Sequence, residues 1–332
     1  LFGPVTDPAR RIRLRPEVRD RVRVSAVVLD ADNGALLASA NYPVPDYDRM
    51  RSRPSDYNRY DDRKGKVGKD FKAYTDMDLG LSFASHPGSS AKVMSAMSGL
   101  IQLGDSASRQ VFKVEAPQIV GADPTGLIDM RAAIVRSSNC YFINLVNKNN
   151  LYPTLESIYG YTGVSINGLS PYRITYAEAT PEWRASVTRG YAGATSTYDR
   201  YCRDYKAGKL KGKDAQMKGR HAHPAWMWEW GQGGLDATPL AMARVVSTVV
   251  NEGKMPVTRF LMSDSVKLID VGGKNAHSLR ILKEYMKAES SEHSHMGMPQ
   301  MGGKTGTAKR VDSTNGGTCN DAWYVCFYEA SN

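Results

Sequence analysis

The sequence predicts a mixed α/β (α+β) fold, in which an antiparallel sheet flanked by helices is built from both chain ends and accompanied by an all-helical lobe. Two observations predict the sheet: near each end of the chain, runs rich in β-branched or aromatic residues flank an Asn-Gly pair. A third observation predicts the helical lobe, because apolar residues three and four positions apart recur between the two ends. At 332 residues, the chain has room for about two lobes.

The N-terminal elements are predicted to form a hairpin. Residues 21–30 (RVRVSAVVLD) are typical of a strand, Asn33-Gly34 of a tight turn, and residues 35–40 (ALLASA) of the returning strand. Residues 43–80 are polar and rich in Asp, Arg and Tyr, which favours a long connecting loop.

The next elements are predicted to be helices. A helix opens at Ser89 and closes at Gly104, since Val93, Met97, Leu100 and Ile101 repeat at helical spacing. A second helix is expected over residues 127–135, a break at Ser137-Ser138-Asn139, and a third helix over residues 140–148.

The C-terminal part is predicted to return to the sheet. The basic, glycine-containing stretch 205–220 favours an exposed loop, and Thr238-Pro239 starts a helix that runs to Gly253. Residues 304–311 and 322–328 are typical of two strands, joined by a loop over residues 312–320.

Composition and charge narrow the class of protein. The chain is 41% hydrophobic and 23% charged, which is typical of a globular protein and excludes a disordered, collagen-like or coiled-coil chain. The net charge of +10 is concentrated in residues 1–24, with +4, and residues 199–220, with +5. Because the rest of the chain is nearly neutral and lacks a binding module for nucleic acid, we expect no nucleic-acid partner.

The first chemical motif is Ser89-Ser90-Ala91-Lys92, at a predicted helix start. Residues three apart share a helix face, so an amine at Lys92 can remove the proton of the Ser89 hydroxyl if burial keeps that amine neutral. The alternative interpretation is a serine helix cap with a solvated lysine.

Two further motifs follow in the chain. Ser137-Ser138-Asn139 lies in the predicted break between helices, where such residues are often only turn formers. Lys304-Thr305-Gly306-Thr307 lies on a predicted strand, where Gly306 allows close backbone approach of a ligand and the threonines offer hydroxyl groups.

The order and surroundings of the three motifs resemble those of the penicillin-binding transpeptidases. Two strings resemble the first two motifs of that family: PGSSAK (87–92) is similar to PGSTFK, and SSNCYF (137–142) is similar to SSNVYF. A third string, GQGGLDATPLAMA (231–243), is similar to GQG…ATPLQMA. The last motif, KTGTA (304–308) followed by DAWYVCF (321–327), is similar to KTGTA…DAWFVGF. The opening string VVLDADNGALLASA (27–40) also resembles the family's first hairpin. The resemblance covers about residues 22–328 and is strongest to the monofunctional class B type. It implies the penicillin-binding transpeptidase and β-lactamase-like fold.

The resemblance implies roles for the motif residues. Ser89 is expected to be the acylated nucleophile, Lys92 its base, Ser137 a proton relay to the leaving amine, and Asn139 a ligand of the substrate amide. In the strand motif, Lys304 is expected to supply positive potential near Ser137 and the substrate carboxylate, and Thr305 and Thr307, separated by Gly306, to bind that carboxylate. The backbone N–H groups of Ser89 and Thr307 would form the oxyanion hole.

The reaction implied is D,D-transpeptidation of peptidoglycan stem peptides through a serine acyl-enzyme, with release of D-Ala and covalent inhibition by β-lactam antibiotics. Three alternatives remain: a D,D-carboxypeptidase, a serine β-lactamase, and a non-enzymatic β-lactam sensor domain. A class A β-lactamase is disfavoured, because no Glu in residues 140–300 is followed four residues later by Asn. The segment after residue 150 also lacks the LPGE-like string that is frequent in class B members.

The resemblance also implies a domain organisation and partners. We expect residues 1–20 to be a linker from a missing N-terminal region and residues 21–332 the transpeptidase domain, with a sheet lobe over about 21–90 and 255–332 and a helical lobe over about 91–254. The family's C-terminal strand and helix are expected to be missing. The expected location is the extracytoplasmic face of the bacterial inner membrane, through an N-terminal anchor outside this sequence, beside a membrane glycan polymerase of the elongation or division machinery.

No cofactor or metal is expected. The four cysteines (Cys140, Cys202, Cys319 and Cys326) fit no zinc spacing, and the two His-x-His pairs, at 221/223 and 293/295, have no third ligand nearby in the sequence. Cys140 is expected to be a small core residue. The tryptophans Trp226, Trp228 and Trp230 are expected to pack beside the site rather than bind glycan.

Overall fold

A computed structural model describes the greater part of the chain. The described residues are 24–42, 79–81, 84–114, 123–166, 207, 209, 228–293, 298–311 and 318–330. The predicted linker 1–20, nearly all of the predicted loop 43–80, and the predicted loop 205–220 apart from residues 207 and 209 lie outside them. Within the described part, no helix combines the length and the apolar character needed to cross a bilayer.

The predicted N-terminal hairpin is confirmed. Strand β1 (Val24–Leu29) pairs antiparallel with β2 (Leu36–Tyr42). The Asp30 carboxylate accepts the backbone N–H groups of Asp32 (2.9 Å) and Asn33 (3.2 Å), so an aspartate turn reverses the chain.

The predicted C-terminal hairpin is confirmed but longer than expected. Strand β9 (Met301–Val311) pairs antiparallel with β10 (Thr318–Tyr328), with Gly306 opposite Trp323. The prediction that residues 312–320 are all loop is wrong at its end, because β10 begins at Thr318. Glycines and polar residues at the strand ends have low strand propensity, but the ladder of eleven paired positions overrides it.

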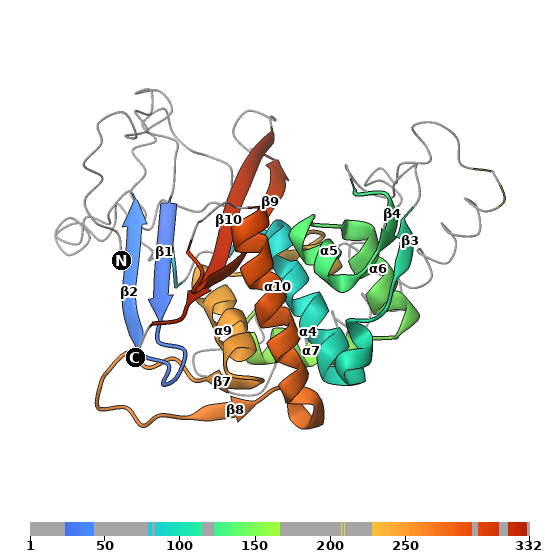
Figure 1. Cartoon of the computed structure of the whole chain (residues 1–332). Coiled ribbons are helices and arrows are strands. Elements are labelled where there is room, and N and C mark those ends of the chain that lie inside the picture. Colours follow the sequence, from blue (N-terminus) through green and yellow to red (C-terminus); the bar gives the residue numbers. More distant parts are fainter. Residues whose placement is uncertain are drawn as a thin grey trace.

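The two hairpins from the chain ends lie on the same side of the helices (Figure 1). Among the described residues, each is a separate two-stranded sheet. Helix α9 (Pro239–Val250) packs against both β1 and β10, so distant segments of the chain share one helix. The side chain of Thr238 accepts the Ala241 N–H, which confirms the predicted cap of this helix.

The remaining elements build the helical side of the molecule (Figure 1). The described α-helices on this side are α4 (Lys92–Leu103), α5 (Met130–Val135), α6 (Asn139–Lys148), α7 (Tyr152–Thr162) and α10 (Leu279–Glu292). Short 3-10 helices are η3 (Gly88–Ala91), η4 (Gly104–Ala107) and η7 (Gly273–Ser278). Short antiparallel pairs are β3 (Phe112–Val114) with β4 (Gly126–Ile128), β5 (Ser165–Ile166) with β6 (Leu235–Asp236), and β7 (Lys254–Pro256) with β8 (Leu268–Asp270).

Two helix predictions need correction at their starts. The helix expected over 127–135 begins only at Met130, because residues 126–128 pair with β3 and the Asp129 carboxylate caps the helix by accepting the Ala132 N–H at 2.7 Å. The helix expected to open at Ser89 starts instead with the tighter turn η3, and regular α-helix begins at Lys92. Ser89 therefore sits in a turn before the helix.

Helices α7 and α10 were not predicted. The segment that contains α7 has a mixed sequence pattern, and α10 is rich in charged and polar residues, with its buried side chains confined to one face. Helix α10 lies along β9 (Figure 1), within the part of the chain expected to form the sheet lobe. This helix contributes a residue to the candidate site.

Helix α4 is the centre of the core. Its side chains Val93, Met94, Met97 and Leu100 are fully buried, and it contacts α6, α7, α9 and α10. A helix surrounded in this way is held by tertiary packing more than by its own propensity. Its first residue, Lys92, is therefore fixed in position by the whole helical side.

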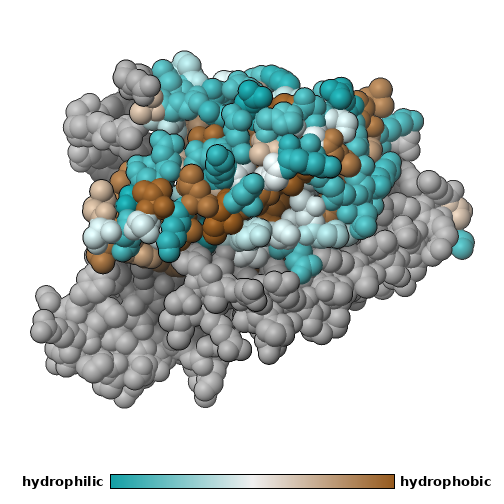
Figure 2. Space-filling model, turned by 90° about the horizontal axis from the view of Figure 1, so that it is seen from below, coloured by the Kyte–Doolittle hydropathy of each residue, from teal (hydrophilic) through white to brown (hydrophobic). Residues whose placement is uncertain are grey.

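The surface is mixed in character. Figure 2 views the molecule from below, where hydrophobic and hydrophilic side chains are interspersed. The large apolar side chains most exposed near β7 and β8 are Phe260, Leu261 and Met262.

Candidate active site

The turn η3 presents Ser89 to the surface. Ser89 is partly exposed, whereas its neighbour Ser90 is fully buried and donates its hydroxyl proton to the Pro87 carbonyl at 2.7 Å. Of the two adjacent serines, only Ser89 is both accessible and next to an amine. The assignment of Ser89 as the nucleophile stays a prediction, with which this geometry is compatible.

Two glycines allow the backbone of η3 to pack tightly against its neighbours. A Cβ at Gly231 would lie 2.0 Å from the Gly88 carbonyl oxygen, and the Gly88 N–H donates to the Gly231 carbonyl at 3.0 Å. A Cβ at Gly306 would lie 2.4 Å from the Pro87 carbonyl oxygen. The space that the sequence suggested for a ligand at Gly306 is therefore filled by the turn η3, and the backbone at Gly231 also packs against this turn.

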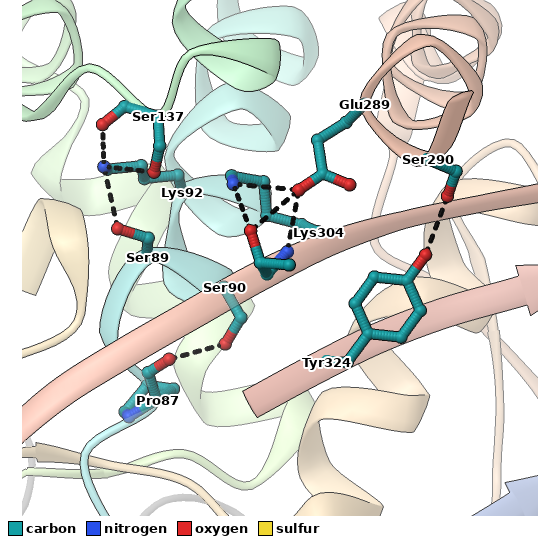
Figure 3. Close-up of polar contacts among 10 residues, drawn as sticks. Pro87, Ser89, Ser90, Lys92, Ser137, Glu289, Ser290, Lys304 and Tyr324 are labelled. Atoms are coloured by element: carbon teal, nitrogen blue, oxygen red, sulfur yellow. Dashed lines mark hydrogen bonds and ion pairs between the residues drawn. The ribbon is translucent and has the colours of Figure 1, made fainter. Parts of the chain in front are cut away.

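Lys92 joins the first two motifs. Its Nζ lies 2.9 Å from Ser89 Oγ, 3.0 Å from Ser137 Oγ and 2.6 Å from the Ser137 carbonyl oxygen (Figure 3). The Lys92 side chain is fully buried. One amine therefore contacts both serine hydroxyls within the range of hydrogen bonds.

The environment of Lys92 favours the neutral amine. Burial is the largest cause that lowers its pKa well below 10.5, and the positive charge of Lys304 lowers it further, while Asp123 and Cys140 act in the opposite direction. A neutral lysine amine can accept a proton, so the position of Lys92 and the direction of its pKa shift are both compatible with a general base.

The break between α5 and α6 positions the second motif. Ser137 has φ of 58°, in the left-handed region, which turns the chain sharply and brings both its carbonyl and its hydroxyl to Lys92. The Ser138 side chain caps α6 by accepting the Tyr141 N–H, and Asp123 Oδ2 accepts the N–H of Asn139 at 3.1 Å. Asn139 is thus the first residue of α6 and not part of the break.

The third motif meets a residue that the sequence analysis did not predict. Glu289 Oε1, from α10, lies 3.2 Å from Lys304 Nζ and accepts both the N–H (3.0 Å) and the hydroxyl (2.8 Å) of Thr305 (Figure 3). The side chains of Lys304 and Glu289 are both fully buried. Burial lowers the pKa of Lys304, and Glu289 opposes this change.

The structure therefore brings Ser89, Lys92, Ser137 and the strand motif together from four elements. Ser89 and Lys92 come from η3 and α4, Ser137 from the turn before α6, and the strand motif from β9. Thr307 is exposed, and its backbone is close to η3, because a Cβ at Gly88 would lie 2.6 Å from the Thr307 carbonyl oxygen. Glu289 was missed, although Leu279, Leu282 and Met286 precede it at helical spacing on one face.

Other residues named from the sequence are placed as follows. Cys140 is buried in the core, and Trp228 and Trp230 are also core residues, at 1% and 6% exposure. No group of three or more potential metal ligands occurs within the part of the chain that the structure describes. Of the residues in the two His-x-His pairs, only His293 is among those described, and Trp226 is not among them.

A partly exposed serine, a buried lysine amine and a second serine in one hydrogen-bonded cluster are the groups that a serine acyltransferase type of site requires. The family model of the penicillin binding protein transpeptidase domain matches residues 24–332. The chain belongs to this family.

Two solved structures from Mycobacterium tuberculosis are similar in fold. The crystal structure of PBPA has a TM-score of 0.56 and 21% identity, with 92% of this chain and 66% of that chain covered. The apo-form crystal structure of penicillin binding protein 3 (PBP3) has a TM-score of 0.56 and 20% identity, with 91% of this chain and 62% of that chain covered. This chain thus spans slightly less than two thirds of each of them. No curated protein sequence matches it.

Proposed function

We propose that the protein is a D,D-transpeptidase that cross-links peptidoglycan stem peptides through an acyl-enzyme at Ser89. The observation that carries this proposal is the position of Lys92 Nζ, within 3.0 Å of the hydroxyl groups of both Ser89 and Ser137. The family assignment supports a transpeptidase, and the cluster supplies a base for its nucleophile.

In the acylation step, Lys92 accepts the proton of Ser89 as Oγ attacks the carbonyl carbon of the D-Ala-D-Ala bond. The negative charge that develops on the carbonyl oxygen is stabilised by the backbone N–H groups of Ser89 and Thr307. The bond to the terminal D-Ala nitrogen then breaks, and Ser137 passes to that nitrogen the proton held by Lys92. The products are an ester at Ser89 and free D-Ala.

In the second step, an amine of a neighbouring stem peptide attacks the ester. The proton of this amine returns through Ser137 and Lys92 to Ser89 Oγ, so the enzyme is regenerated and one amide bond replaces another. Asn139 holds the substrate amide during both steps. Lys304 provides positive potential, and Thr305 and Thr307 bind the terminal carboxylate of the donor peptide.

The same site accounts for reaction with β-lactams, whose strained amide replaces the D-Ala-D-Ala bond. No leaving group departs in that case, because the ring opens and remains attached to Ser89. The domain organisation expected from the sequence, the location on the outer side of the inner membrane, and the glycan polymerase partner are parts of the same proposal.

The test is labelling with a fluorescent penicillin, followed by intact-mass measurement and peptide mapping. We expect one adduct per chain, mapped to Ser89 rather than Ser90, and no adduct in Ser89→Ala. Ser106→Ala, which changes an exposed serine just after α4, is the matched control and should label as the wild type does. Unimpaired labelling of Ser89→Ala would refute the assignment.

A stem pentapeptide with a labelled D-amino acid as acceptor separates the transpeptidase from the alternatives. A transpeptidase releases D-Ala and incorporates the acceptor, whereas a carboxypeptidase releases D-Ala without incorporation. A β-lactamase turns over the penicillin adduct, and a sensor forms the adduct but releases no D-Ala.

A further inference from the structure

Glu289 occupies hydrogen-bond donors that the proposed function assigns to a ligand. The Thr305 hydroxyl has one proton, and it donates this proton to Glu289 Oε1 at 2.8 Å. The same hydroxyl oxygen accepts from Lys304 Nζ at 3.3 Å. A ligand carboxylate can therefore receive the proton of Thr305 only after the bond to Glu289 breaks.

The charges lead to the same conclusion. Lys304 and Glu289 form an ion pair at 3.2 Å, and both side chains have no exposed surface. The carboxylate balances the lysine charge next to the strand that is proposed to bind an anionic ligand. Solvent screens the charges of a buried pair only weakly, so the negative charge of Glu289 lowers the positive electrostatic potential that neighbouring groups experience from Lys304.

Helix α10 holds Glu289 in this position. The adjacent Ser290 shares a hydrogen bond of 2.8 Å with the Tyr324 hydroxyl on β10 (Figure 3), and α10 packs along β9. The Thr305 N–H, a backbone group that cannot turn away, also donates to Glu289 at 3.0 Å. Glu289 is therefore fixed against the strand motif by contacts on both sides.

We propose that Glu289 is a specificity-determining, positioning residue that weakens recognition of an anionic carboxylate at the strand motif. It acts through Thr305 and Lys304 and does not touch the reacting atoms. Ligand recognition then depends more on Thr307, which is exposed on the same strand, and on groups of the ligand other than its carboxylate. This inference rests on the proposed acylation of Ser89.

The experiment compares two probes that differ only in charge: benzylpenicillin, with a free carboxylate, and its methyl ester. The second-order rate of Ser89 acylation is measured for each, and the acid-to-ester ratio is compared between the wild type and Glu289→Gln. Glutamine has nearly the same shape but no charge. We expect the ratio to rise by at least about tenfold, which is about 1.4 kcal/mol in favour of the anionic probe.

A fold defect would lower both rates together and leave the ratio unchanged, so the ratio separates recognition from stability. If Glu289→Gln does not fold, Glu289→Leu replaces it with the same criterion. Glu292→Gln is the matched control, because Glu292 lies on the same helix, is half exposed and pairs with Arg131; its ratio should stay at the wild-type value.

An unchanged or lower ratio in the Glu289 variant overturns the inference. This result differs from a failure of the proposed function, in which neither probe would acylate wild-type Ser89.

Discussion

Glu229 is a fully buried carboxyl group, and replacing it should change how folding stability depends on pH. It lies in the turn before Gly231, where Glu229 Oε1 accepts the Tyr152 hydroxyl at 2.7 Å and its backbone carbonyl accepts the Ser95 hydroxyl at 2.9 Å. Burial raises the pKa of Glu229 from 4.5 to about 8, against the opposing effect of the Tyr152 hydrogen bond. The folded protein therefore keeps the Glu229 proton at neutral pH, whereas the unfolded chain loses it.

The sign and size follow from this difference in pKa. Between pH 4.5 and pH 8 the folded state binds one proton more than the unfolded state, so stability falls as pH rises. At about 1.4 kcal/mol per pH unit, the gap between 4.5 and about 8 sets an upper limit of about 5 kcal/mol. Below pH 4.5 both states hold the proton, and the full contribution to stability is present.

In Glu229→Gln this contribution disappears, while the glutamine carbonyl can still accept the Tyr152 hydroxyl. The difference in free energy of unfolding between the variant and the wild type should therefore grow in favour of the variant, by ~2–5 kcal/mol, as the pH rises from about 5 to about 8.5. Urea unfolding followed by tryptophan fluorescence across this range measures the gain. Any constant offset from repacking cancels, because only the change with pH is compared.

Glu252→Gln, which alters a carboxyl group that is about half exposed, is the control and should give a curve parallel to that of the wild type. The pKa of His86 is also raised, chiefly by its hydrogen bond with Asp236, but His86 is present in all three proteins and drops out of the difference. Parallel curves for the wild type and Glu229→Gln would refute the assignment of a proton to Glu229 at neutral pH.

Two further predictions concern the active site. Lys304→Met removes a positive charge that lowers the pKa of Lys92, so the acid limb of the pH profile of penicillin acylation should move to higher pH. Lys309→Met, on the same strand, is the control and should leave the acid limb in place. If the acid limbs of Lys304→Met and the wild type coincide, the electrostatic coupling between Lys304 and Lys92 is contradicted. Gly231→Ala should lower the rate of Ser89 acylation by at least about a hundredfold or prevent folding, because the new Cβ would lie 2.0 Å from the Gly88 carbonyl oxygen. Gly126→Ala is the control and should retain acylation, because Gly126 also has a positive φ, of 103°, but no atom lies within 4 Å of the new Cβ. Similar acylation rates for the two variants would argue against the backbone contact at Gly231.

Much of the candidate site could be predicted because its residues lie in short contiguous strings. Ser89 and Lys92 are one helical turn apart, so their proximity follows from local geometry alone. The meeting of Lys92 with Ser137 does not, because 45 residues separate them and the contact depends on how α4 packs beside the turn before α6. The resemblance to a known family supplied this long-range information, which spacing could not.

The elements that were mispredicted have local preferences that tertiary contacts override. Residues 126–128 pair with β3 although they precede a helix, and β10 starts at Thr318 because a partner strand is present. Helix α10 was missed because its polar face dominates its composition. For both strands the deciding contact is with a partner strand, which the local sequence pattern does not reveal.

The two buried glutamates show most clearly what sequence patterns leave open. Glu229 and Glu289 are both fully buried, yet one accepts a phenolic hydroxyl and the other pairs with an ammonium group. A buried carboxyl group with only neutral partners favours its proton, whereas one beside a lysine balances a charge. Burial alone would assign them the same role. The partner decides whether the residue governs the pH dependence of stability or the charge that a ligand encounters, and only the fold identifies the partner.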